Sequence, residues 1–304
     1  MTLPIFLELV EMKAKTASVL PFLIGLCFSA YYYNSVHPVY VGLFFVAMFL
    51  FNMFVDIWNN YNDYRNAVDL DYKNDTNIIG RENLSLRQIE VIMASLVITS
   101  SMIGLVLVSQ VGLPLLWMGL FCFGIGVLYS FGPRPLSSLP LGEVFSGLTM
   151  GFMISLICVY LNTYQNFSWD ILNLSKIFLI SLPNTLWIAN LMLANNLCDK
   201  EEDEKNHRYT LVHYTGIRGG LLLFAISNSI ALLAIVFEFL FGLAPVTVLL
   251  SLLLIPFIYK QTKLLWQKQV KRETFVFAVR ILALGSATQV LTYLIGIIFR
   301  GVLS

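Results

Sequence analysis

The sequence has little charge, few histidines and no paired cysteines. Asp, Glu, Lys and Arg make up 12% of the 304 residues, about half the share found in soluble domains. The four cysteines form no CxxC pair and the three histidines form no ligand pattern, so we expect buried thiols rather than a thiolate metal site. The net charge of +1 does not favour a polyanionic partner, and nucleic-acid binding is not predicted.

Long apolar runs are abundant instead. Hydrophobic residues make up 58% of the chain, and the mean hydropathy is +0.76. A run of about 20 apolar residues is long enough to cross a bilayer. We therefore predict an all-α, multi-pass membrane protein in which residues 1–304 form one domain. The nine predicted spans are 16–33, 38–58, 89–110, 113–131, 142–162, 175–195, 219–239, 243–260 and 275–299.

The basic residues predict how the chain is oriented. With the N-terminus in the cytoplasm, all but three of the 19 Lys and Arg residues fall in inner segments, as the positive-inside rule requires. The C-terminus is then outside, and the basic run 260–272 is interpreted as attachment to the inner leaflet. Glu8 and Glu11 stand where a signal peptide would have a basic start, so we expect the first run to remain a membrane helix.

Two clusters of acidic and amide residues follow apolar runs, both on the predicted cytoplasmic side. Spacings of three, four and seven residues place the members of a cluster on one face of a helix. Asp71 and Asp75, beyond the first cluster, are interpreted as solvated surface. The first cluster is Asp56, Asn59, Asn60, Asp63 and Asp69, and the second is Asn195, Asn196, Asp199 and Asp203.

Two such faces in one membrane chain predict a shared cation site, because stacked carboxylates repel each other unless a positive charge lies between them. Hard oxygen ligands with few histidines favour Mg²⁺. A solvated helix can show the same spacing, but two clusters make that explanation weaker. A metal site at a lipid-facing cavity suits a diphosphate with a hydrocarbon tail, since the metal binds the head group and the membrane solvates the tail.

A proline-bounded loop follows the fourth run. Pro133 and Pro135 flank Arg134 where no helix can continue, and Glu143 lies at the start of the next run. The turn needs its glycine and prolines regardless of function. Arg134 is the only fixed positive charge in this loop, and it is a candidate contact for an anion.

These motifs resemble those of the UbiA superfamily of intramembrane prenyltransferases, and the resemblance covers nearly the whole chain. It implies nine transmembrane helices around a central cavity, with the active site on the cytoplasmic side. Several stretches are similar to the 1,4-dihydroxy-2-naphthoate polyprenyltransferase branch in particular. These stretches are residues 129–136 together with 141–143, residues 203–211 together with Gly216, and residues 13–16. Residues 13–16 are similar to that branch's Arg-Pro-Lys-Thr motif, with two substitutions.

The resemblance also implies roles for single residues. The implied catalytic residues are Asp63, Asp199 and Asp203. The implied ligands of Mg²⁺ are Asn59, Asn60, Asp63, Asp69, Asn196, Asp199 and Asp203. The implied diphosphate contacts are Arg134 and Arg208, with Lys15, Arg65 and Lys205 as further candidates, and Asn195, Tyr129 and Glu143 complete the candidate site.

The sequence departs from the branch at two positions. Asn60 stands where an acidic residue is usual, and Ala67 stands where glycine is usual. Asp56 lies one helical turn before Asn60 and two before Asp63, so it is a further candidate ligand that could replace the missing acid. A divergent paralogue with weak or lost activity is an alternative that the departures leave open.

We therefore predict transfer of a polyprenyl group from its diphosphate to 1,4-dihydroxy-2-naphthoate, with loss of CO₂, giving demethylmenaquinol. The acceptor is implied by the resemblance alone, and another aromatic acceptor such as 4-hydroxybenzoate is the alternative within the same fold. An ion-coupled transporter is the alternative from another class, but its acids would lie near the membrane midplane. The predicted partners are the two substrates and membrane lipid.

Overall fold

The computed structural model describes residues 1–67 and 69–303, and every regular element in this part of the chain is a helix. Eight helical spans are long and apolar enough to cross a membrane, and α6 (Leu113–Leu128) is a shorter apolar helix. Each of the nine predicted runs thus corresponds to a helix. The eight longer spans are Met12–Tyr32, which includes α2 (Thr16–Tyr32), α3 (Pro38–Asn66), α5 (Leu86–Val111), Gly142–Thr163, α9 (Ile171–Cys198), α11 (Leu211–Leu240), Val246–Gln267 and α13 (Lys271–Leu303).

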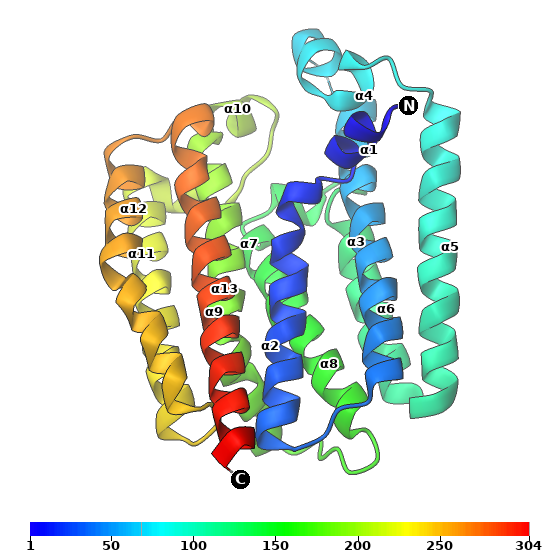
Figure 1. The fold of residues 1–304 in the computed structure, drawn as a ribbon. Helices are drawn as coiled ribbons and strands as arrows, with labels where there is room; N and C mark the ends of the chain where they lie inside the picture. The colour runs from blue at the N-terminus through cyan, green and yellow to red at the C-terminus, as the bar shows by residue number, and fades with distance from the viewer. Residues whose placement is uncertain (68, 304) are drawn as a thin grey trace.

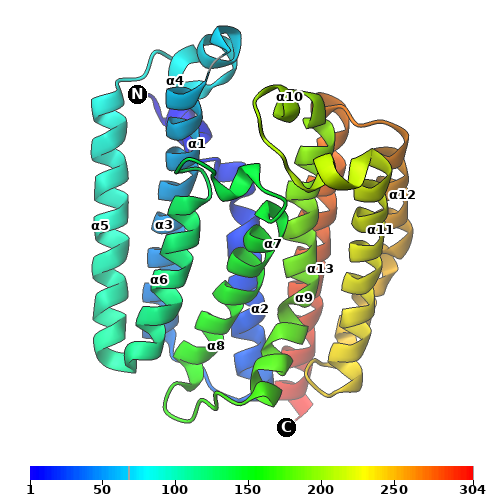
Figure 2. The same ribbon diagram turned by 180° about the vertical axis from the view of Figure 1, so that it is seen from behind.

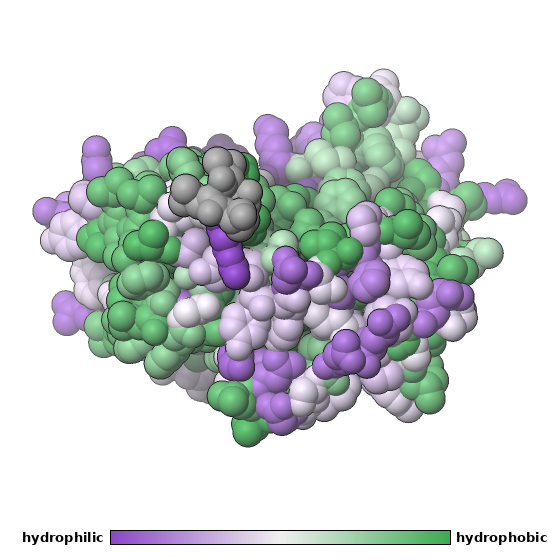
Figure 3. All heavy atoms as spheres, turned by 60° about the horizontal axis from the view of Figure 1, so that its bottom comes forward, coloured by the Kyte–Doolittle hydropathy of each residue, from purple (hydrophilic) through white to green (hydrophobic). Residues whose placement is uncertain are grey.

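The spans run side by side in one bundle (Figures 1 and 2). The N-terminus and the end of α13 lie at opposite ends of this bundle (Figure 1), as the predicted orientation requires. The short helices α1 (Leu3–Leu9), α4 (Ile78–Arg81) and α10 (Lys200–Lys205) all lie at the N-terminal end. The opposite face mixes hydrophilic and hydrophobic side chains (Figure 3), as expected of a surface where helices leave a bilayer.

The polar segment between the second and third spans contains short helical elements. It contains the π-helical turn η2 (Tyr72–Thr76) and α4, where Asn77 Oδ1 accepts a hydrogen bond from the backbone N–H of Ile79 (2.9 Å). Asn77 Nδ2 also donates to the carbonyl oxygen of Asn60 (3.0 Å). This bond fastens the segment to the part of α3 that carries the first cluster.

Small residues bring helices close together inside the bundle. The fifth span consists of α7 (Gly142–Ser146), the π-helical η4 (Gly147–Met153) and α8 (Ile154–Thr163). A Cβ atom at Gly151 would lie 2.5 Å from the Cα atom of Thr185 in α9, and one at Gly147 would lie 2.6 Å from the carbonyl oxygen of the same residue. This GxxxG spacing is a common device for close helix packing in membranes, where lipid provides no hydrophobic force between helices.

Polar side chains within the bundle bond to one another across helices. Asn184 Nδ2 in α9 donates to Gln289 Oε1 in α13 (2.8 Å), and Gln289 Nε2 donates to Glu238 Oε1 in α11 (3.0 Å). All three side chains are fully buried. These bonds connect α9, α11 and α13 inside the bundle.

We expect Gly151→Ala to lower the unfolding temperature of the purified protein in detergent. The added Cβ would push η4 away from the backbone of α9, and overpacking of this kind typically costs about 1–3 kcal/mol. Gly104→Ala is the matched control, because its Cβ would meet no atom within 4 Å and alanine favours the helix. Equal unfolding temperatures for the two variants would contradict the close packing.

Candidate active site

Four members of the first cluster, Asp56, Asn59, Asn60 and Asp63, lie in the C-terminal part of α3, whereas Asp69 lies beyond the end of this helix at Asn66. Asn59 Oδ1 is buried and has no hydrogen-bond partner. Asn60 Nδ2 donates to the carbonyl oxygen of Asp56, one turn earlier (3.0 Å), so the amide that replaces the usual acid is tied to its own helix. Asp63 is partly exposed. The helix therefore presents amide and carboxylate oxygens at one end of the bundle.

The second cluster spans a junction between two helices, whereas the sequence predicted one continuous helix face. α9 ends at Cys198 and α10 begins at Lys200, and Asp199 has non-helical backbone angles (φ −100°, ψ 8°). The backbone N–H of Asp203 nevertheless donates to the carbonyl oxygen of Asp199 (2.8 Å). Asp203 therefore still lies one turn beyond Asp199, and its side chain is buried.

Glu143 connects the fifth span to the second cluster. Asn196 Nδ2 donates to Glu143 Oε1 (2.8 Å), and both side chains are almost fully buried. Because a carboxylate oxygen accepts, this bond fixes which end of the Asn196 amide faces Glu143 and leaves Asn196 Oδ1 for another partner. Glu143 Oε2 is buried without a partner. The backbone carbonyl oxygen of Asn195 accepts a hydrogen bond from the backbone N–H of Asp199 (3.0 Å).

Arg208 joins the separate parts of the site. Its Nε lies 3.3 Å from Asp203 Oδ1, and its Nη2 donates to the carbonyl oxygen of Ser137 in the proline-bounded loop (3.4 Å). Its charge also stabilises the carboxylate of Asp63 in the first cluster, and Tyr129 lies within reach of the charges of both Arg208 and Glu143. Arg208 thus connects the second cluster to the proline-bounded loop, and its charge reaches the first cluster.

Burial alters the acidity of groups at this end of the bundle. It raises the pKa of the Asp203 carboxyl to about 6, although the positive charge of Arg208 acts in the opposite direction. Burial also raises the pKa of the Tyr72 hydroxyl to about 12, and the negative charge of Asp63 adds to this effect. The charges of Arg208 and Glu202 also act on Tyr72, to a smaller extent.

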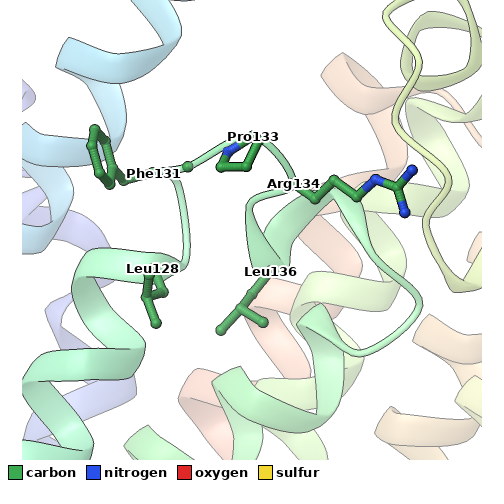
Figure 4. Close-up of a pocket in the computed structure, with 6 residues that line it drawn as sticks. Leu128, Phe131, Pro133, Arg134 and Leu136 are labelled. Carbon is green, nitrogen blue, oxygen red and sulfur yellow. The ribbon is translucent and has the colours of Figure 1, made fainter.

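Arg134 lies at a shallow surface pocket in the proline-bounded loop. The pocket has a volume of about 320 Å³ and is lined by Leu128, Phe131, Gly132, Pro133, Arg134 and Leu136. The Arg134 guanidinium extends away from Leu128 and Phe131 (Figure 4), and its side chain is exposed. The backbone N–H of Tyr209 donates to the carbonyl oxygen of Ser138 (3.0 Å), which fastens this loop beside Arg208.

Lys15 and Asp56 form a shielded ion pair, with side chains 5% and 15% exposed. The sequence suggested that Lys15 contacts diphosphate and that Asp56 replaces the missing acid of the first cluster. In the structure each of these charges neutralises the other, and the pair holds the start of the first span against α3. This pairing favours a structural role for both residues.

Three further candidates lie at the margin of the site. Arg65 Nη1 donates to Tyr61 Oη (3.3 Å), which donates to Glu90 in α5 (2.6 Å), so Arg65 faces α5 rather than the second cluster. Asp69 Oδ1 accepts from the backbone N–H of Asp71 (2.9 Å). Lys205 is exposed at the end of α10. Diphosphate binding by Lys205 and metal binding by Asp69 remain predictions.

The oxygen atoms of the site fit Mg²⁺. Within residues 1–67 and 69–303, no three His, Cys, Asp or Glu side chains are close enough to form a complete metal cage. Mg²⁺ does not require one, because it is usually held by one or two carboxylates together with substrate phosphates and waters. Asn59 Oδ1, Glu143 Oε2 and Asp203 Oδ2 are all buried without a hydrogen-bond partner. Such atoms are rare in folded proteins, and a bound cation would satisfy them.

Lys271 is a site residue that sequence reasoning missed. Its ammonium forms an ion pair with Asp199, and its charge stabilises the carboxylates of Asp63 and Asp203. The sequence placed it in the basic run assigned to leaflet attachment. No local signal distinguishes Lys271 from the neighbouring Lys268 and Arg272, because only the folding of α13 against α9 turns it towards the clusters.

Comparison with known proteins places this geometry in a family. The model of the UbiA prenyltransferase family matches residues 18–285. The 1,4-dihydroxy-2-naphthoate octaprenyltransferase of Bacillus subtilis (strain 168) is 29% identical over 231 residues, which cover 75% of this chain and 71% of that protein.

Solved structures show the same fold. A UbiA homologue from Aeropyrum pernix K1 has a TM-score of 0.70 at 17% identity, covering 91% of this chain and 97% of its own. A UbiA homologue from Archaeoglobus fulgidus bound to DMAPP and Mg²⁺ has a TM-score of 0.61 at 16% identity, covering 93% of this chain and 98% of its own. The family match extends over both oxygen-rich clusters and most of the spans, and the chain belongs to the UbiA prenyltransferase family.

Proposed function

We propose that this protein transfers a polyprenyl group from polyprenyl diphosphate to 1,4-dihydroxy-2-naphthoate. The ion pair of Arg208 with Asp203, within electrostatic reach of Asp63, supports the diphosphate site, and the likeness to the Bacillus subtilis enzyme supports the acceptor. The C–O bond between the prenyl group and diphosphate breaks, and a C–C bond forms to the aromatic ring. The ring carboxylate leaves as CO₂ and the diphosphate leaves as an anion, so the product is demethylmenaquinol.

The residues of the two clusters hold the diphosphate head group. Asn59, Asp63, Asn196, Asp199 and Asp203 would ligate Mg²⁺. When bound, Mg²⁺ neutralises the charge that develops on the departing diphosphate.

Arginine supplies the remaining charge at the head group. The planar guanidinium of Arg208 binds two phosphate oxygens at once and stays charged at every relevant pH. Arg134, exposed in the adjoining loop, provides a second guanidinium on the same side. The prenyl tail then extends from this end of the bundle into apolar surroundings, where the membrane solvates it.

We also propose that the end of the bundle that carries the site faces the cytoplasm. Most Lys and Arg residues lie in the segments at this end, which is the cytoplasmic side by the positive-inside rule. The end of α13 lies at the other end of the bundle and would then be outside.

The acceptor is tested by feeding membranes labelled polyprenyl diphosphate with either 1,4-dihydroxy-2-naphthoate or 4-hydroxybenzoate and measuring product mass. We expect a product with the naphthoate whose mass shows the loss of CO₂. Membranes lacking the protein are the control. A product with 4-hydroxybenzoate alone would replace the proposed acceptor, and no product with either would indicate the inactive paralogue.

We expect Asp63→Ala and Asp199→Ala each to abolish turnover, because each cluster supplies only part of the metal and diphosphate site. Asp75→Ala is the control, since this carboxylate is exposed in η2 and should leave turnover unchanged. Activity is measured on purified protein, with thermal unfolding to show that each variant is folded. A wild-type rate in either cluster variant would rule out a shared site.

Glu143→Leu should weaken metal binding, because it removes the acceptor that orients the Asn196 amide. Loss of a partner that orients a ligand typically costs about 10–100-fold in metal affinity or activity. Glu143→Gln keeps an acceptor oxygen and should lose less. Mn²⁺ binding followed by electron paramagnetic resonance, together with the Mg²⁺ dependence of turnover, measures the effect. Metal affinity in Glu143→Leu equal to that of the wild type would show that this bond only supports packing.

A further inference from the structure

We propose that Lys271, at the start of α13, binds the diphosphate head group of the prenyl substrate, an inference that rests on the proposed function. The ammonium of Lys271 forms an ion pair with Asp199 in the second cluster. It also lies within electrostatic reach of Asp63 in the first cluster and of Asp203 in the second. The positive charge of Lys271 thus lies beside the second cluster and within reach of the first, where a diphosphate bound between them would be.

The start of α13 is held in a defined place, which fixes the direction of Lys271. The backbone N–H of Val270 donates to Thr274 Oγ1 (2.9 Å), and the backbone N–H of Thr274 donates to the carbonyl oxygen of Val270 (2.8 Å). Thr274 is buried. Lys271 is the first residue of the helix, a position that disfavours a positive charge because the helix dipole is positive there. Helix stability therefore does not account for a lysine at this position.

The exposure of the Lys271–Asp199 pair distinguishes it from a structural ion pair. The side chain of Lys271 is 54% exposed while that of Asp199 is 11% exposed. Ion pairs with one solvated partner contribute little to stability. The ammonium has three donors, so contact with Asp199 leaves others available to phosphate oxygens. Lys15, by contrast, is enclosed with Asp56 and cannot be reached in this way.

Two cations then bind the head group from different parts of the chain. Arg208 comes from the segment between α10 and α11, and Lys271 is the first residue of α13. The charge of Arg208 stabilises the same two carboxylates, Asp63 and Asp203. A diphosphate carries more negative charge than one guanidinium can balance, and a second cation beside the same carboxylates adds both charge and orientation.

The test measures binding of an unreactive prenyl thiolodiphosphate, in the presence of Mg²⁺, to the purified full-length protein. We expect Lys271→Gln to weaken binding about tenfold or more, as loss of a charge-assisted contact does, and Lys271→Arg to restore most of it. Lys268→Gln is the matched control, since Lys268 pairs with the exposed Glu273 (2.6 Å). The KM for the aromatic acceptor should be the same in all variants.

Several results would overturn this assignment. Wild-type affinity in Lys271→Gln would show that the residue does not bind the head group. A lower unfolding temperature in Lys271→Gln with unchanged affinity would show a structural pair with Asp199. If the wild type binds the analogue but prenylates no acceptor, the proposed function fails while the role of Lys271 is still decided by the variants. If the wild type does not bind the analogue, both proposals fail.

Discussion

Repulsion between like charges is the constraint on which the active-site end of this molecule depends. Asp199 and Asp203 lie one helical turn apart with little exposure to solvent, so their carboxylates repel each other. Asp63, from the distant first cluster, lies within electrostatic reach of the same two cations, Arg208 and Lys271. Arg208 and Lys271 offset that repulsion in the protein alone. The same arrangement attracts a metal ion and a diphosphate, because the site has more oxygen ligands than the two cations satisfy. Stability and substrate binding therefore rely on the same charges.

The apolar bundle keeps these charged groups in register. In the fifth span, Gly147 and Gly151 allow η4 to touch the backbone of α9, and a few residues earlier Glu143 bonds to Asn196. The close packing and the polar contact lie along the same pair of helices, so the position of the metal-ligand candidate Asn196 depends on packing deeper in the membrane. Buried Glu238 and Gln289 connect α11 and α13 and stabilise the side of the bundle that presents Lys271.

Periodicity predicted the two oxygen-rich clusters, because residues four apart must lie close together on a helix. It did not predict the junction at Asp199, where the helix is interrupted but the backbone bond to Asp203 is kept. It also suggested that Asp56 could bind the metal. In the structure Lys15 pairs with Asp56, a contact between residues 41 positions apart that no local pattern reveals. Arg65 bonds to Tyr61, which bonds to Glu90 in α5, and the face of α3 that packs on α5 is likewise set by the bundle.

The sequence by itself determined the helical class, the nine apolar segments, the motifs of the family and the end of the bundle that carries charge. These follow from hydropathy and from spacing along a single helix. Tertiary structure alone decided which charges are paired within the protein and which remain available to a ligand. Lys15 and Lys271 are both lysines that precede an apolar span, but one is enclosed with Asp56 and the other is exposed beside Asp199. The physical reason is that solvent access to an ion pair depends on how separate helices pack, which is a property of contacts distant in the chain.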